Sequence, residues 1–146
     1  MSKSTLAQAQ AALVSALVAG GPLPTGFDTD RVAVAQHALR RKRAGEVARV
    51  WPILAASLGD AWIPCFCRWS AGKPPRGSLR DGWDLARELA DRDQLSPRAA
   101  RELAFRDTVM RYDGRRDPRR RMLPTIRRVP GGLAFGALGR GHLLWR

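Results

Sequence analysis

The sequence predicts a mainly α-helical protein, a helical bundle of five to six helices with a small C-terminal antiparallel β appendage. Three observations lead to this prediction. Apolar residues recur at helical spacing in successive blocks as far as residue 112, and proline or glycine clusters separate the blocks. After residue 112, short apolar stretches alternate with glycine-rich turns, as they do in β-hairpins. We therefore expect a helical domain over residues 1–112, followed by an Arg-rich junction and short strands over residues 113–146.

The first two helices are predicted from their caps and breakers. Ser4 is a candidate N-cap, and the glycines and proline at residues 20–22 end the helix that follows it. Asp28 is the next candidate cap, for a helix that extends to about Val50. Pro52 then begins a new helix, because proline fits a first turn and disfavours helix at the residue before it.

The remaining helices carry similar signals. Gly59 closes the short helix at Pro52, and Asp60 can cap another that reaches about Trp69. Ser78 and Asp81 form a capping-box pattern for a helix that ends near residue 91. The Ser-Pro pair at residues 96–97 begins a last helix, which we expect to extend to about residue 112.

A basic loop at residues 113–121 separates this bundle from three extended stretches. These stretches cover residues 122–129, 133–138 and 142–145, with turns predicted at residues 130–132 and 139–141.

The charge balance is unusual. The 146 residues include 26 Lys and Arg against 13 Asp and Glu, which gives a net charge of +13. A field of this size attracts polyanions such as nucleic acid, anionic lipid or an acidic protein surface. Only Lys3, Lys42 and Lys73 are lysines. The arginine preference fits bidentate contacts to carboxylate or phosphate, and it fits a GC-rich genome equally well.

Three carboxylates, Asp81, Asp84 and Glu88, lie at one-turn spacing and are candidates for a metal-binding or acid/base face. Because Arg80 and Arg87 are interspersed with them, a solvated, salt-bridged helix face is the simpler interpretation. A small metal-dependent enzyme that uses these three residues is the least favoured hypothesis.

The other residues that could support catalysis are isolated. His37 has no Asp, Glu or Cys at ligand spacing, and His142 is close to the C-terminus. Cys65 and Cys67 point about 200° apart on a predicted helix, so we expect buried thiols without a mutual bridge. No glycine-rich stretch follows a phosphate-loop or dinucleotide pattern. We predict no catalytic residue, cofactor or metal site, and expect that the chain is not an enzyme.

Four tryptophans, Trp51, Trp62, Trp69 and Trp83, fall at apolar positions of the predicted helices. This placement favours packing in the core over stacking on bases. Trp145 lies in the last predicted strand, where it can either pack on the body or be presented to a partner; the sequence leaves both open.

Two basic segments are candidates for binding. Residues 40–43 cover all faces of a helix, so they contact an anion or form a solvated helix surface, and the sequence does not separate the two. Residues 115–128 are denser in arginine, and Asp113 and Asp117 neutralise little of their charge, so this segment favours a partner contact. The candidate partner- or peptide-binding residues are Arg115, Arg116, Arg119, Arg120, Arg121, Arg127, Arg128 and Trp145.

A family resemblance rests on a run of motifs in the middle of the chain. They are Trp-Pro-Ile-Leu-Ala-Ala-Ser-Leu-Gly-Asp at residues 51–60, Phe66, Trp69, Gly-Lys-Pro-Pro at residues 72–75 and Ser-Leu-Arg-Asp-Gly-Trp at residues 78–83. This pattern resembles a bacterial DNA-binding-domain family of small partner proteins that accompany multinuclear non-haem iron oxidases. Gly-Gly-Pro-Leu-Pro at residues 20–24 is similar to an actinobacterial branch. The resemblance covers residues 28–110 and rests on turns and core aromatics.

The resemblance implies a partner subunit that docks on the iron-bearing barrel enzyme and helps hold the leader segment of a cysteine-containing precursor peptide. It implies no catalytic residues in this chain. The resemblance to the β appendage is weaker, so no residue role is transferred there.

Together these observations predict a non-catalytic partner of a multinuclear non-haem iron oxidase in ribosomal peptide modification. We expect the leader peptide to add a strand to the β appendage while arginines meet its acidic residues. The alternative is a nucleic-acid-binding module that uses the basic surface. The sequence shows no secretory signal and no apolar run of about 20 residues, so we expect a cytoplasmic protein without a membrane partner.

Overall fold

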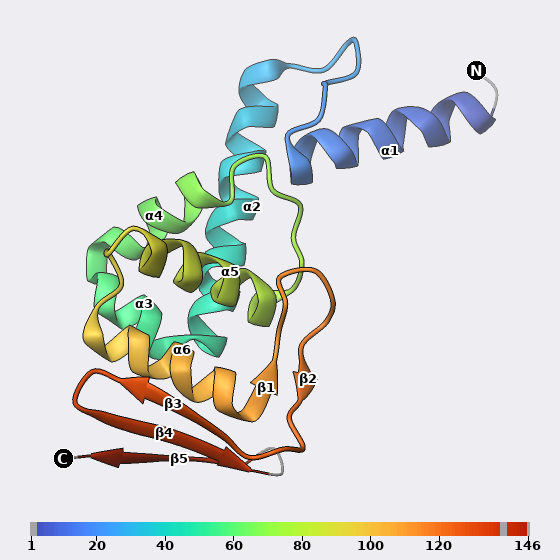
Figure 1. The fold of residues 1–146 in the computed structure, drawn as a ribbon. Helices are drawn as coiled ribbons and strands as arrows, with labels where there is room; N and C mark the ends of the chain where they lie inside the picture. The colour runs from blue at the N-terminus through green and yellow to red at the C-terminus, as the bar shows by residue number, and fades with distance from the viewer. Residues whose placement is uncertain (1–2, 138–139, 146) are drawn as a thin grey trace.

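The computed structural model describes residues 3–137 and 140–145. Figure 1 shows a helical body with a small β-sheet along its last helix, so the predicted mainly α fold with a C-terminal antiparallel sheet is confirmed. The elements are α1 (Lys3–Ala19), α2 (Thr29–Val50), α3 (Pro52–Leu58), the 3-10 turn η1 (Gly59–Ala61), α4 (Trp62–Trp69), α5 (Ser78–Asp91), α6 (Pro97–Val109), β1 (Met110–Arg111), β2 (Arg119–Arg120), β3 (Thr125–Val129), β4 (Gly132–Ala137) and β5 (Arg140–Trp145).

Several predicted helix boundaries are confirmed. The Asp28 carboxylate caps α2 by accepting hydrogen bonds from the N–H groups of Asp30 and Arg31. Pro52 occupies the first turn of α3. The Ser96 hydroxyl caps α6 by accepting a hydrogen bond from the N–H of Ala99.

Four helix ends differ from the prediction. The predicted cap at Asp60 was wrong, because Asp60 lies inside η1 and α4 has Ala61 as its N-cap without a side-chain cap. The first helix already includes Lys3, one residue before the predicted cap. The capping box at Ser78 was wrong, because Gly77 (φ 92°) precedes α5 and Asp81 binds a distant arginine instead. The last helix ends at Val109 and not near residue 112, because Met110 and Arg111 pair with β2.

The C-terminal sheet is antiparallel in the order β3-β4-β5. Val129 pairs with Gly132 across the first turn, and Thr125 pairs with Gly136. The predicted strand at residues 122–129 begins only at Thr125, whereas residues 119–120, predicted as loop, form β2. The last strand begins at Arg140, two residues before its predicted start.

Helix α6 lies against one face of this sheet, and Figure 1 shows all the described helices on that side. Two glycines that pair across β4 and β5 make the close approach possible. A Cβ atom at Gly136 would lie 2.5 Å from the carbonyl oxygen of Thr108, and one at Gly141 would lie 2.6 Å from the Phe105 ring. Any side chain at either position would push the sheet away from α6.

The core of the helical body is aromatic. Trp51, Trp62 and Trp83 are buried and Trp69 is half-buried, as predicted for these four residues. Trp62 and Trp69 both pack against the Phe66 ring.

Trp51 occupies the break between α2 and α3, where it is fully buried. Its indole N–H donates a hydrogen bond to the carbonyl of Leu79 (3.0 Å), and its ring meets the Trp83 ring edge-on at 5.7 Å. A Cβ atom at Gly82 would lie only 2.1 Å from its Cδ1 atom. The indole therefore fills a notch in α5 that only glycine leaves open.

Cys65 is half-buried and Cys67 is buried, and the two thiols are not bridged. Among residues 3–137 and 140–145, no single helix is both long and apolar enough to cross a membrane. Only a pair bent by 119°, Thr29–Val50 with Pro52–Trp69, meets the length and composition test when its two parts are joined.

The Gly82 notch predicts a large difference between two glycine substitutions. Gly82→Ala should lower the free energy of unfolding by about 2 to 3 kcal/mol or more, because its methyl group overlaps the Trp51 ring. Gly45→Ala is the matched control, since a Cβ there meets nothing within 4 Å and alanine favours helix by about 0.5 to 1 kcal/mol. Urea denaturation of both variants measures the difference, and equal stabilities would contradict the notch.

Candidate functional site

Six of the predicted arginines form an exposed basic segment that starts after Tyr112 and continues into β3. Each has an exposed side chain, and none forms a salt bridge with a carboxylate in the described part of the chain. We call this set the exposed arginines: Arg115, Arg116, Arg119, Arg120, Arg127 and Arg128.

Two of the predicted site residues do not join this set. Arg121 is half-buried, and its Nε donates hydrogen bonds to the carbonyls of Asp107 (2.8 Å) and Met110 (3.2 Å). Its N–H also donates to the carbonyl of Val109 (2.9 Å), so Arg121 fastens the segment to the end of α6. The Trp145 side chain lies outside the described residues.

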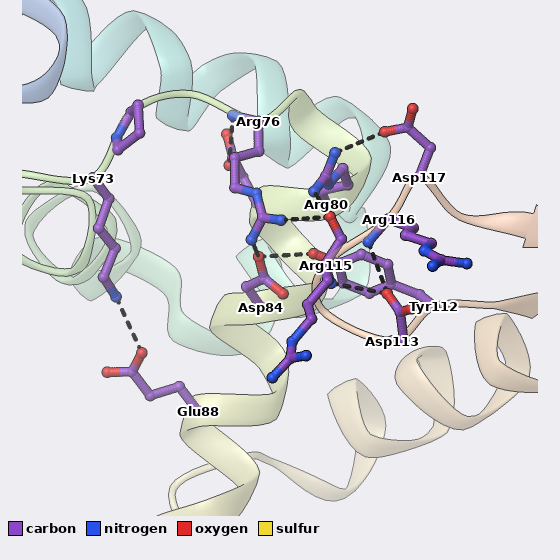
Figure 2. A network of polar contacts seen from close by, with 12 residues as sticks. Lys73, Arg76, Arg80, Asp84, Glu88, Tyr112, Asp113, Arg115, Arg116 and Asp117 are labelled. Carbon is purple, nitrogen blue, oxygen red and sulfur yellow. Dashed lines mark hydrogen bonds and ion pairs between the residues drawn. The ribbon is translucent and has the colours of Figure 1, made fainter.

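One main-chain carbonyl holds the loop before β2 to α5 and to the residues just before that helix. Arg76 and Arg80 both donate hydrogen bonds to the carbonyl oxygen of Arg115, at 3.0 and 2.7 Å, as Figure 2 shows. Arg80 also pairs with Asp117 at 2.7 Å. The Arg115 backbone is therefore anchored while its side chain is exposed.

A turn centred on Asp113 fixes the same loop from the other side. The N–H groups of Arg115 and Arg116 each donate a hydrogen bond of 2.8 Å to its carboxylate. These backbone hydrogen bonds lower the pKa of Asp113, because they stabilise the charged form. The Asp113 carboxylate thus binds the backbone of its own loop.

Tyr112 connects the basic segment to the core. Its ring packs on Trp83 with centroids 5.3 Å apart, and its hydroxyl donates to Asp84 at 3.0 Å (Figure 2). Burial raises the pKa of Tyr112, the hydrogen bond to Asp84 acts in the same direction, and the nearby Arg80 opposes both.

The three carboxylates of α5 are paired with cations that come from outside that helix. Asp84 bonds Arg76 at 3.5 Å, and Glu88 bonds Lys73 at 3.2 Å. Arg80 and Arg87, which are interspersed with these carboxylates, bind Asp117 and Asp107 instead. Arg92, at the C-cap of α5, pairs with Glu88 at 2.7 Å, so Asp84 and Glu88 do lie on a salt-bridged face, as predicted. Among residues 3–137 and 140–145, no group of three or more His, Cys, Asp or Glu is placed to hold a metal ion.

Asp81 departs furthest from the prediction, because it is buried and not solvated. The Arg43 guanidinium donates two hydrogen bonds, of 2.7 and 2.8 Å, to its carboxylate. The same guanidinium donates to the carbonyls of Lys73 and Pro74, at 2.8 and 3.3 Å. Within the basic run at residues 40–43, Arg43 is therefore structural, while Arg41 and Lys42 are exposed.

Strand β3 follows the basic loop and forms an edge of the sheet. In the part of the chain that the structure describes, nothing pairs with its outer side. Ile126, Arg127 and Arg128 are exposed along it. Main-chain groups at such an edge can accept another extended segment.

A groove between α3 and α6 was not predicted from the sequence. It has a volume of about 750 Å³ and is lined from α3 by Pro52, Ile53, Ala56 and Ser57 and from α6 by Arg98, Arg101, Glu102, Phe105 and Arg106. The groove brings together residues some 50 positions apart in the sequence, so no local pattern predicts it. The one related signal is Ile53, which has a helical apolar position and is exposed in the structure. Its buried Glu102 already accepts a hydrogen bond from the N–H of Leu54 (2.8 Å), so the groove offers mostly apolar surface.

The environment of Tyr112 predicts a pH effect, which is easy to read because the chain contains one tyrosine. Absorbance of tyrosinate should show the phenol ionising above pH 10 in the folded protein and near pH 10 in denaturant. The raised pKa stabilises the fold below about pH 10, and this contribution is lost as the pH rises through the folded-state pKa. Identical titrations in both states would show that Tyr112 is not buried against α5.

Comparisons with known proteins match mainly the helical body. The model of the SCO6045-like, C-terminal domain family matches residues 7–91, from α1 to the end of α5. A UPF0276 protein from Streptomyces avermitilis is 47% identical over 88 residues, which cover 60% of this chain. The chain spans only 18% of the length of that relative. No solved structure matches this chain. The chain belongs to the SCO6045-like, C-terminal domain family.

Proposed function

We propose that this chain is a non-catalytic partner domain that docks on a multinuclear non-haem iron oxidase and helps recruit the leader segment of its precursor peptide. The peptide adds a strand along β3, and acidic leader residues meet the exposed arginines. The class of enzyme comes from the resemblance of residues 28–110, and the mode of binding comes from the structure of the C-terminal segment.

The proposal rests on the outer edge of β3, with which nothing pairs in the described part of the chain, and on the exposed arginines, which form no salt bridge with a carboxylate there. Strand addition gains affinity from main-chain hydrogen bonds, and β3 offers such groups at the edge of its sheet. Arg127 and Arg128 lie on this strand, so an acidic residue of the added segment can form charge-assisted hydrogen bonds there. Arg76 and Arg80 anchor the main chain at Arg115, in the basic loop that precedes β3.

The comparisons support a domain that works beside a larger protein. The family description names a C-terminal domain, and in the Streptomyces avermitilis relative the matching region is a small part of a much longer chain. A domain that is covalently joined to a larger protein in one relative is a natural partner of such a protein.

Nucleic-acid binding is the second candidate, and the net charge of +13 favours it. It differs from peptide recruitment in its salt dependence, because each neutralised phosphate releases counterions. Exposed Arg41 and Lys42 on α2 would then contribute as much as the arginines near the sheet.

Co-purification separates the two candidates. The tagged chain should be isolated from the extract of its native organism, once before and once after nuclease treatment. Each sample is washed at moderate and high salt, and the partners are identified by mass spectrometry. We expect an iron-containing barrel oxidase to survive the high-salt wash. Recovery of nucleic acid alone before nuclease treatment would contradict the partner proposal and support the alternative.

Charge reversal then locates the contact. Arg119→Glu with Arg120→Glu should weaken binding of the precursor peptide by about tenfold or more, because it places negative charge beside acidic leader residues. Arg41→Glu with Lys42→Glu changes the net charge equally on α2 and should leave peptide affinity nearly unchanged. Arg121 is kept, since it holds the end of α6. Equal losses in both double variants would mean that only the overall charge matters.

A further inference from the structure

The short β1–β2 ladder places two arginines directly opposite each other. Arg111 pairs with Arg119 in the antiparallel register, and both side chains are exposed. Like charges at facing positions of a β ladder destabilise it, whereas an anion held between them removes the repulsion.

A small cavity lies at the same place. It has a volume of about 170 Å³ and is lined by Arg111, Asp113, Arg116, Asp117 and Arg119. Ligand pockets for whole small molecules occupy roughly 300 to 1,000 Å³, so this cavity suits a single functional group.

The two carboxylates on its rim are engaged elsewhere. Asp113 accepts the N–H groups of Arg115 and Arg116, and Asp117 accepts a hydrogen bond from Arg80 at 2.7 Å. In the described part of the chain no salt bridge joins either carboxylate to Arg111 or Arg119. The guanidinium groups of the rim therefore keep donors for an external acceptor.

The charge of the rim attracts an anion. Three arginines and two aspartates line the cavity, and Arg80 pairs with one of these aspartates, Asp117, at 2.7 Å. Guanidinium groups bind a carboxylate through two parallel hydrogen bonds, and a peptide supplies that group as Asp or Glu. A phosphate group carries about 1.5 to 2 negative charges and would be repelled more strongly by the Asp113 carboxylate.

The geometry points to a carboxylate-binding pocket formed by Arg111, Arg116 and Arg119 that takes one Asp or Glu side chain of a bound peptide. The inference rests on the proposed function for the source of that side chain, and on the ladder and the cavity for the pocket itself. Occupation would stabilise the β1–β2 ladder and so connect peptide binding to the end of α6, because β1 follows α6 directly.

The isolated chain and defined probes test this pocket. Arginine Nε–Hε signals are followed by NMR during titration with acetyl-Gly-Glu-Gly-amide, the matched Gln peptide, and inorganic phosphate. We expect saturable shifts of Arg111, Arg116 and Arg119 with the Glu peptide, none with the Gln peptide, and weaker binding of phosphate. Uniform, unsaturated shifts that include Arg41, or tighter binding of phosphate, would overturn the inference.

Two variants complete the test. Arg119→Ala should weaken binding of the Glu peptide by about tenfold or more, while the exposed control Arg41→Ala retains it. Without peptide, Arg119→Ala should raise the unfolding midpoint slightly, because it removes the repulsion from Arg111. A lower midpoint together with unchanged peptide affinity would overturn the pocket. Glu-peptide binding by a chain that captures no oxidase would contradict the proposed function and still support the pocket.

Discussion

The arrangement of this protein depends on the fit of Trp51 into the notch at Gly82. Because the indole lies at the break between α2 and α3, the fit fixes α5 against this break. Arg106 of α6 stacks on the same ring at 4.2 Å and donates to the carbonyl of Val50, which ties α6 to the break. The contact continues from Trp51 through Trp83 to Tyr112, the residue after which the basic loop starts. Packing in the core thus determines where the exposed arginines begin.

Two groups of arginines in this basic chain have different roles. One group clamps main-chain carbonyls of loops and helix ends: Arg43, Arg76, Arg80, Arg87, Arg101, Arg106 and Arg121. A guanidinium suits this role better than an ammonium group, because its planar donors can reach a carboxylate and a carbonyl together, as Arg43 does. The arginine preference of the sequence therefore has a structural cause in addition to any binding. The exposed arginines form the second group, and edge charge on β3 would also hinder unwanted strand pairing between copies.

The helices and their order could be predicted from local signals, since caps such as Asp28 and breakers such as Pro52 act within one turn. The predictions were wrong where contacts between residues far apart in the sequence determine the local structure. Asp81 has the sequence position of a capping residue, but Arg43, 38 residues earlier, binds it in the folded chain. The end of α6 shifted because β2 pairs with residues that favour helix locally. Of the candidate site, the exposed arginines were predictable from composition, whereas the clamping role of Arg121 and the facing pair in the β1–β2 ladder depend on register.

Backbone hydrogen exchange tests most directly whether a peptide extends the sheet at β3. Exchange should be compared for the chain in complex with its oxidase, with and without the precursor peptide. We expect slower exchange when the peptide binds for the amides of residues 125–129 that point away from β4, with α4 and α5 unchanged, because the new strand pairs with that side of β3. Peptide binding that leaves the exchange of β3 unaltered would contradict strand addition.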